Sequence, residues 1–300
     1  MISPTRPAEP ITWPAGHRAA AALTFDVDAE SAVLHEHPAA RHRMSVMTHQ
    51  SYGPLVGVPR LLRILDRHGI RATFCVPGWT ALRYPDVVRS IAAAGHEIAH
   101  HGYLHELLTS VDAQAEAGFL DRGLAALESV AGVRPVGYRA PMWELSYHTP
   151  GLLKERGFLY DSSLMDADVP YELALADGTS LVEIPIQWAL DDWEQYCYLP
   201  GISGTGLIES PAKVLEMWTL EFQAMRREGG CFVLTNHPFL SGRPSRAAAL
   251  ETLIERIIAT GDTWVAPLAD IAHHVRSLGL TPRVLTPPDL ETGPGTDLEP

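Results

Sequence analysis

The sequence predicts an α/β fold in which parallel strands form a barrel or a doubly wound sheet. About eight short apolar segments alternate with helical segments along the 300 residues, which is the pattern of repeated strand–helix units. The first segment, residues 19–27, is apolar at nearly every position, as a strand buried on both faces would be. No glycine-rich phosphate loop is present, and this absence together with the eight-unit count favours the barrel.

The expected elements follow in a regular order between residues 19 and 280. A polar stretch to Tyr52 shows no firm period, so we expect the histidine-containing residues 33–52 to form a loop over the active face. Further strands are expected around Ile98 and at 70–76, 136–140, 158–160, 180–186, 231–235 and 263–266. Helices are expected at 58–68, 85–94, 111–130, 150–156, 212–227, 247–259 and 268–278, several with proline near the start or glycine at the end.

These elements predict one folded domain with two extensions. Residues 1–18 are rich in proline and are interpreted as an N-terminal arm. Residues 19–280 form the predicted catalytic barrel. Residues 281–300 are acidic and rich in proline and glycine, so we expect a disordered tail.

Composition excludes several classes of partner. The net charge of -13 makes nucleic acid and anionic membrane surfaces unfavourable partners. No apolar run approaches the length of a membrane span, and the first residues lack the hydrophobic core of a secretory signal, so a cytoplasmic location is expected. Three scattered cysteines argue against a disulfide framework.

The most distinctive stretch of the chain is GHEIAHHGYLHE, from Gly95 to Glu106. It predicts a brief strand that runs into a turn. His101 and His105 are four residues apart, and on a helical turn that spacing would place both imidazoles on one face, able to hold one metal ion. By itself the pair is a weak signal, because a polar loop can be rich in histidine by chance.

Other polar residues strengthen the metal interpretation, because they too fall where predicted strands end. In a barrel these carboxyl ends open on one face. The residues are Asp26 and Asp28 after the first strand, Arg139 after the fourth, Asp161 after the fifth and His237 after the seventh.

These residue types together are sufficient for hydrolysis of a planar acyl group, an amide or an ester. Asp28, His101 and His105 would supply three ligands and leave a position open, a set that suits zinc, although cobalt, iron or manganese is compatible. Asp26 points to the same side as Asp28 and could accept a proton from water, with Arg139 holding it ionised. His237 could protonate the leaving nitrogen or stabilise the oxyanion.

Each candidate also has a purely structural interpretation. The two aspartates could cap a helix, Arg139 could form a plain salt bridge, and His237 could simply end a strand. Asp161 is interpreted as a turn or supporting residue, and His96 and His100 as hydrogen-bonded neighbours. Four residues are candidates for substrate binding, although aromatic clusters often serve only packing: Trp143, Trp188, Asp192 and Trp193.

Four motifs, in order, resemble those of the polysaccharide deacetylases of the NodB-homology type, also called carbohydrate esterase family 4. They are TFDVD at 24–28, HGYLH at 101–105, RAPMW at 139–143 and TNHP at 235–238. The resemblance covers roughly residues 20–275 and implies a distorted (β/α) barrel of about seven strands. It also implies that Asp26 is the base, with Arg139 its partner, and that His237 is the acid. The implied metal ligands are Asp28, His101 and His105.

One departure bears on the substrate. The family usually has adjacent aspartates in its first motif, whereas Val27 intervenes here. That variant, with GRPSR at 242–246, is similar to a cytoplasmic branch with peptidoglycan deacetylase-like proteins, cyclic imide hydrolases and a metal-independent allantoinase type. The expected substrate is thus an N-acetyl saccharide or a small cyclic imide or ureide. A homodimer or homotetramer is expected from the same resemblance. A non-catalytic carbohydrate-binding barrel is the competing class, but both base and acid candidates are present.

Overall fold

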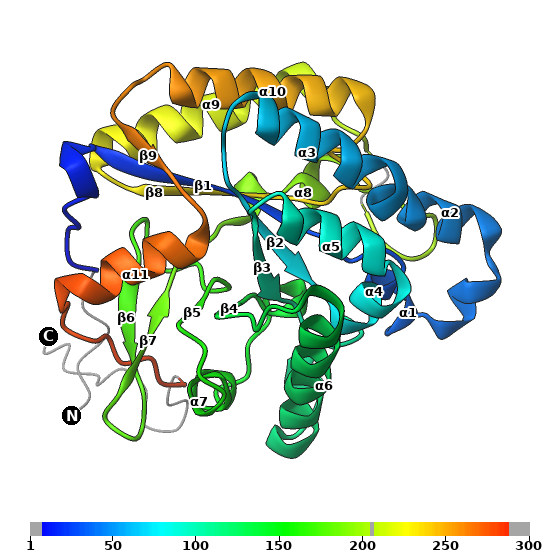
Figure 1. The fold of residues 1–300 in the computed structure, drawn as a ribbon, viewed down its shortest axis with the longest axis horizontal. Helices are drawn as coiled ribbons and strands as arrows, with labels where there is room; N and C mark the ends of the chain where they lie inside the picture. Colours follow the sequence, from blue (N-terminus) through cyan, green and yellow to red (C-terminus); the bar gives the residue numbers. More distant parts are fainter. Residues whose placement is uncertain (1–7, 205–206, 288–300) are drawn as a thin grey trace, which may run out of the picture.

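The computed structural model of the chain describes residues 8–204 and 207–287. A sheet of nine strands lies at its centre (Figure 1). The strands are β1 (Ala19–Asp26), β2 (Thr73–Val76), β3 (Glu97–His100), β4 (Gly137–Tyr138), β5 (Tyr160–Asp161), β6 (Tyr171–Ala174), β7 (Ser180–Glu183), β8 (Cys231–Asn236) and β9 (Thr263–Val265).

The strand order makes the sheet an open barrel. Along the sheet it is β6-β7-β5-β4-β3-β2-β1-β8, and β9 pairs with β1 beside this path. The strand pairings are parallel, apart from the antiparallel pair of β6 and β7. The terminal strands β6 and β8 share no ladder within the described residues. The predicted α/β barrel is therefore confirmed, in a curled and open form.

Each of the eight predicted strand segments overlaps a strand, with only Tyr160 shared between the predicted 158–160 and β5, and β6 is the strand that sequence reasoning missed. Glu172 lies in the middle of β6, and such a charged residue argues against a buried strand. The side chain is nevertheless buried, with its Oε1 atom 3.3 Å from Nε of Arg276. The apolar pattern did not predict this strand, because the burial of Glu172 depends on an ion pair with a residue distant in the sequence.

Strand β1 shows why the sheet is buried on both sides. Ala21, Leu23 and Phe25 belong to one apolar core, whereas Ala20 and Ala22 belong to another. Successive residues of a strand point to opposite faces, so a strand between two cores carries apolar residues on both faces. All eight of its residues are buried. This burial fixes the position at which the polar Asp26 emerges at the carboxyl end.

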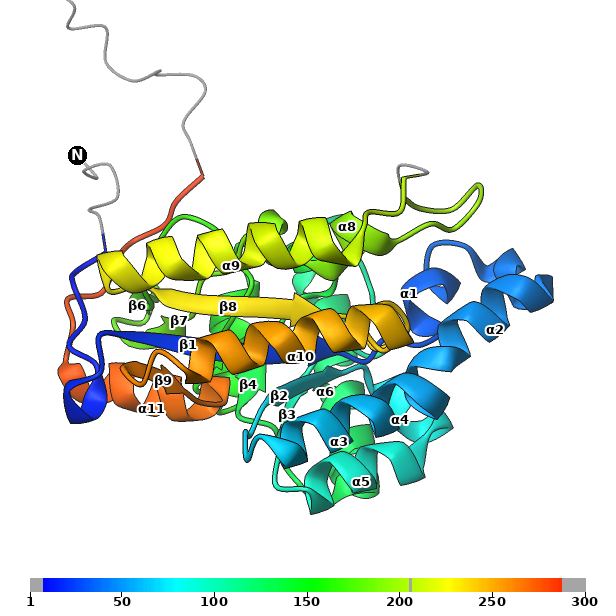
Figure 2. The ribbon, with the colours of Figure 1, turned by 90° about the horizontal axis from the view of Figure 1, so that it is seen from above.

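Helices cover the outer face of the sheet, and Figure 2 shows α9 and α10 running alongside β8 and β1. The longer helices confirm the predicted pattern, while the short α4 and α8 were not predicted. The helices of this layer are α3 (Val58–Arg67), α4 (Gly78–Arg83), α5 (Pro85–Ala93), α6 (Ala113–Ala131), α7 (Thr149–Glu155), α8 (Asp192–Tyr196), α9 (Pro211–Glu228) and α10 (Pro244–Ile258). The last helix, α11 (Leu268–Leu278), packs in the other core, with Ala20 and Ala22 of β1.

The segment that follows β1 is helical, so the prediction of a loop over residues 33–52 was wrong. It contains α1 (Ser31–Leu34), the 3₁₀ turn η2 (Pro38–His42), α2 (Met44–Tyr52) and the π-turn η3 (Gly53–Gly57). Each helix is too short to show a clear period, which is why the sequence pattern did not reveal them. The segment lies beyond the carboxyl end of β1 (Figure 2). Its buried residues Val33 and Val46 belong to the same core as Leu23 and Phe25 of β1.

Both predicted extensions contact the barrel where they are described. In the arm, Trp13 is 3% exposed and its indole Nε1 donates to the carbonyl of Gly229. In the predicted tail, Arg283 is buried and bridges to Leu173 of β6, so residues 281–287 include a part bound to the sheet. Residues 1–7 and 288–300 lie outside the described residues. Within the described residues, no helix has the length and apolar character of a membrane span.

Candidate active site

The first acidic pair of the site stands at the carboxyl end of β1. Asp26 is the last residue of the strand, and Asp28 follows in a tight turn where Ala29 has a φ of 52°. The hydroxyls of Ser31 and Thr80 both donate to the Asp28 carbonyl, at 2.7 and 2.6 Å. These bonds fix the backbone from which the carboxylate projects. Asp26 and Asp28 are each only 1% exposed.

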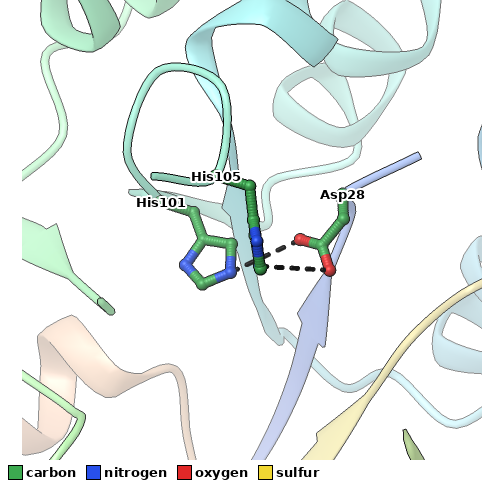
Figure 3. A group of neighbouring side chains, drawn as sticks. All are labelled: Asp28, His101 and His105. Atoms are coloured by element: carbon green, nitrogen blue, oxygen red, sulfur yellow. Dashed lines mark ion pairs between the residues drawn. The ribbon is translucent and has the colours of Figure 1, made fainter. Parts of the chain in front are cut away.

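His101 and His105 come from the loop after β3 and face Asp28 (Figure 3). Nε2 of His101 is 3.4 Å from Asp28 Oδ1, and Nε2 of His105 is 3.7 Å from Oδ2. The predicted grouping is present, but the helical argument for it was wrong, because residues 101–105 form an irregular turn. His105 has a φ of 61°, which is uncommon for a residue other than glycine.

The chemistry of these three side chains fits a divalent cation. Their donor atoms lie within 4.8 Å of one another, and all three residues are buried. Neither oxygen of Asp28 accepts a hydrogen bond from the described residues, which leaves a buried carboxylate unsatisfied. Two ligands, each about 2.1 Å from a tetrahedral ion, stand about 3.4 Å apart, close to the observed nitrogen–oxygen separations. Nδ1 of His101 lies 2.8 Å from the Arg139 carbonyl, so Nδ1 carries the proton and Nε2 is free to ligate.

Asp26 forms a buried ion pair with Arg139, as the sequence predicted. Nη1 of Arg139 donates to Asp26 Oδ1 at 2.9 Å and to the Thr24 hydroxyl at 2.8 Å. Burial raises the pKa of Asp26, but the charge and hydrogen bond of Arg139, together with the charges of His101 and His237, outweigh this effect. The net pKa lies below the ordinary value. The other oxygen, Oδ2, accepts no hydrogen bond from the described residues and lies 3.9 Å from His101 Nε2.

Residues at the end of β5 hold Arg139 in place, and Asp161 is a supporting residue among them, as predicted. The guanidinium Nε donates to the Ser162 carbonyl at 3.0 Å, and Nη2 donates to the Ser162 hydroxyl at 3.2 Å. The Ser163 hydroxyl donates to Asp161 Oδ1 and accepts from the Ala140 amide. The Asp161-Ser162-Ser163 run thus supports Asp26 through Arg139.

His237 completes the site from β8. Its Nε2 is 3.5 Å from Asp28 Oδ2, and its Nδ1 is 2.8 Å from Asp192 Oδ1 and 3.4 Å from Asp191 Oδ1. Burial alone lowers the pKa of His237, but the two neighbouring carboxylates more than offset this effect. The net pKa therefore lies well above the ordinary histidine value. A protonated imidazole at neutral pH is suited to act as a general acid.

Asp192 differs from its predicted role in substrate binding. It is fully buried behind His237, and its carboxylate also accepts the backbone amides of His237 and Ser241. Asp191, which was not assigned a role, caps α8 through the Trp193 amide. The two residues come from the segment after β7, and a parallel bridge between Asp191 and Thr235 brings that segment against β8. The consecutive acidic residues were the only sequence signal for this contact.

The three predicted aromatic residues lie beside these groups. Trp143 and Trp188 stack with ring centroids 4.4 Å apart, and Trp188 is 44% exposed. Trp193 meets the His237 ring at 5.0 Å in a tilted, edge-on arrangement. Trp143 and the preceding Met142 both have positive φ values, 56° and 55°. Consecutive residues in this region are strained, and such strain is concentrated at functional sites.

The remaining histidines of the central stretch, His96 and His100, both form hydrogen bonds with the backbone. Nε2 of His100 is 3.1 Å from the Leu120 carbonyl, and Nδ1 of His96 accepts the Ala72 amide. The prediction that both are hydrogen-bonded neighbours is confirmed.

An open (β/α) barrel with two aspartates, two histidines, an arginine and an acidic histidine at one end defines a hydrolase of acyl bonds. Comparison with known proteins identifies the family. The polysaccharide deacetylase family model matches residues 41–160. The chain is 32% identical to the peptidoglycan deacetylase-like protein FGM2 of Gibberella zeae over 265 residues, 77% of this chain and 78% of that protein. It is 33% identical to a peptidoglycan deacetylase of Helicobacter pylori over 236 residues, 70% of this chain and 80% of that protein.

Solved structures agree with this result. A protein of Mycobacterium smegmatis, assigned by name to the polysaccharide deacetylases, is 62% identical with a TM-score of 0.94, over 96% of this chain and 100% of that one. The allantoinase Puue shares the fold, with a TM-score of 0.79 and 24% identity over 89% of this chain and 93% of that one. The chain belongs to the polysaccharide deacetylase family. It is accordingly a hydrolase that acts on amide bonds.

Proposed function

We propose that the protein removes acetyl groups from N-acetylated sugars and that it requires a divalent metal, with zinc the expected ion. The observation that carries this proposal is the pair of unsatisfied Asp28 oxygens facing His101, His105 and His237. A buried carboxylate without hydrogen bonds is costly unless a cation or proton satisfies it. An ion bound there would lower the pKa of a water molecule and polarise the acetyl carbonyl.

The side chains of the chain supply the proton transfers. Asp26 is held ionised by Arg139, and its Oδ2 is free to accept the proton of the attacking water. His237, held protonated by Asp191 and Asp192, would donate a proton to the leaving amine nitrogen. Opposite pKa shifts on the two residues keep one group basic and the other acidic at the same pH.

The aromatic residues support a saccharide substrate. Trp188 lies on the segment that leads to Asp191 and Asp192, and Trp143 lies on the segment that follows Arg139. The stacked pair therefore connects the segment that supports His237, the acid, with the segment that carries Arg139, the partner of the base. Because almost half of Trp188 is exposed, its ring is available to stack on the apolar face of a sugar.

A second candidate is the opening of a small cyclic imide or ureide, which breaks the same kind of bond. The deep burial of the reacting groups favours it, since Asp26 is 1% exposed and His237 is 6% exposed. A compact substrate reaches such groups more readily than the interior of a polymer chain does.

One assay separates the two candidates. The zinc-loaded protein would be incubated with N-acetylglucosamine oligomers and, separately, with succinimide, glutarimide, hydantoin and allantoin. Acetate release from the oligomers supports the deacetylase, and ring opening without acetate release supports the second candidate. Absence of any hydrolysis by zinc-, cobalt- and manganese-loaded protein would contradict both. The variant His237→Gln, which lacks the acid, serves as the control for contaminating activity.

A further inference from the structure

The loop that carries the two histidine ligands has an unusual backbone. It runs from Gly102 to Glu106, between the end of β3 and the turn η4 (Leu108–Ser110). Gly102 has a φ of 71° and His105 has a φ of 61°. A histidine in the left-handed region persists only when its surroundings determine the conformation. The position of His105 therefore depends on whatever holds this loop.

Two buried side chains of the stretch satisfy three consecutive backbone amides of the loop. Glu106 accepts the Tyr103 amide at Oε2 (2.9 Å) and the Leu104 amide at Oε1 (2.7 Å). His100 accepts the Gly102 amide at Nδ1, at 3.1 Å. Glu106 is 2% exposed and His100 is fully buried. Each bond closes a short ring, so together they fold the chain back on itself.

Neighbouring helices anchor this arrangement. The proton that His100 carries on Nε2 points to the Leu120 carbonyl in α6. The amides of Gly78 and Trp79, in α4, donate to the carbonyls of Gly102 and Tyr103, at 3.1 and 2.8 Å. The loop is thus tied to two helices through contacts that involve neither Asp28 nor the ligating nitrogens.

We propose that Glu106 is a positioning residue that folds the metal-binding loop before any metal is bound. With both oxygens occupied by backbone amides, Glu106 is not itself a ligand. Its carboxylate sets the turn that brings His105 to face Asp28 beside His101. The inference rests on the proposed metal site but not on the identity of the substrate. The contrary account is that the metal itself folds a loop that is mobile in the free protein.

Hydrogen exchange of the metal-free protein distinguishes these accounts. If Glu106 folds the loop, the Tyr103 and Leu104 amides are protected without metal, and Glu106→Ala abolishes that protection. If the metal folds the loop, both amides exchange rapidly in the metal-free wild type, which would overturn the proposal. Because this experiment needs no metal, its result stands even if the protein is found not to be a metalloenzyme.

Metal affinity provides the second readout. Loss of a residue that orients ligands typically weakens metal binding 10- to 100-fold, and we expect about that loss for Glu106→Ala by competition with a chelator. Glu106→Gln keeps one acceptor oxygen and should lose less, a graded rescue that general destabilisation does not explain. It also keeps the test available if Glu106→Ala does not fold.

The matched control is Glu116→Gln. Glu116 is also fully buried and lies on α6, but the hydrogen bond it accepts comes from the Ser146 hydroxyl and not from an amide of the loop. The affinity of the Glu116→Gln variant for zinc should remain within about twofold of the wild-type affinity. The absorption spectrum of the cobalt-loaded protein should broaden for the Glu106 variants and not for the control. Equal affinity and equal spectra in Glu106→Ala and wild type would refute the positioning role.

Discussion

Arg139 Nη1 and Asp26 Oδ1 lie 2.9 Å apart in a pair that solvent barely reaches. The contact engages only one oxygen of the carboxylate. The second oxygen, Oδ2, faces His101 and accepts no hydrogen bond among the described residues. Arg139 therefore holds Asp26 in its ionised form while leaving an atom that can accept a proton.

Replacement of Asp26 by asparagine should separate metal binding from catalysis. We expect the Asp26→Asn variant to bind zinc with wild-type stoichiometry, because the ligands Asp28, His101 and His105 are unchanged. The amide cannot accept the proton, so kcat should fall by about 10²- to 10⁴-fold. Metal analysis and initial rates measure the two effects. A kcat within twofold of the wild type would remove Asp26 as the base.

Replacement of Arg139 should shift the acidic limb of the pH–rate profile. Asp26 works when deprotonated, so activity rises as the pH increases through its pKa. Arg139 lowers that pKa, and in Arg139→Gln the limb should therefore move to higher pH. The buried, unpaired carboxylate should also cost about 3–5 kcal/mol of unfolding free energy, measurable with urea.

Arg139→Lys is the companion variant, since it keeps the charge but not the planar contacts to Ser162. Its acidic limb should lie between those of the wild type and Arg139→Gln. An unmoved limb in both variants would show that Arg139 does not control the ionisation of Asp26.

Replacement of Asp192 should shift the basic limb in the opposite sense to the Arg139 effect. His237 works when protonated, so activity is lost as the pH rises through its pKa. Asp191 and Asp192 raise that pKa, and Asp192→Asn should lower it and bring the limb to lower pH. The pH dependence of kcat/KM measures this shift. If the limb stays in place while the rate falls uniformly, Asp192 does not tune the acid.

Replacement of Trp188 should affect binding rather than chemistry. An aromatic stack contributes about 0.5–1.5 kcal/mol, so Trp188→Ala should raise KM for an N-acetylated oligosaccharide by about 2- to 10-fold with kcat unchanged. The exposed Tyr147 provides a control, since Tyr147→Ala removes an accessible ring outside the stacked pair. A fall in kcat without a change in KM would contradict the proposal that Trp188 binds the substrate by stacking on a sugar.

The rule that functional residues follow the carboxyl ends of parallel strands located most of the candidate site from sequence, because those ends lie along one edge of the sheet. Asp26, Arg139 and His237 each terminate or follow a strand, and the structure brings them around Asp28. The rule needs only the order of strands and helices. It does not require knowledge of which strands are neighbours, which explains why it succeeded before the topology was known.

Features that depend on tertiary contact were not predictable. The spacing of His101 and His105 suggested a helical turn, whereas Glu106 and His100 hold them in an irregular loop. Asp192 was assigned to the substrate because no sequence pattern reveals that a segment after β7 packs on β8. Residues 33–52 lacked a clear period because the segment is divided into short helices.

Metal removal and reloading test the central claim most directly. The purified protein would be stripped with a chelator, assayed, and then titrated with zinc alongside a His105→Ala variant. The account predicts that the stripped protein is inactive and that about one zinc ion per chain restores the rate, with no restoration in His105→Ala. Full activity of the stripped protein, verified as metal-free by elemental analysis, would contradict it.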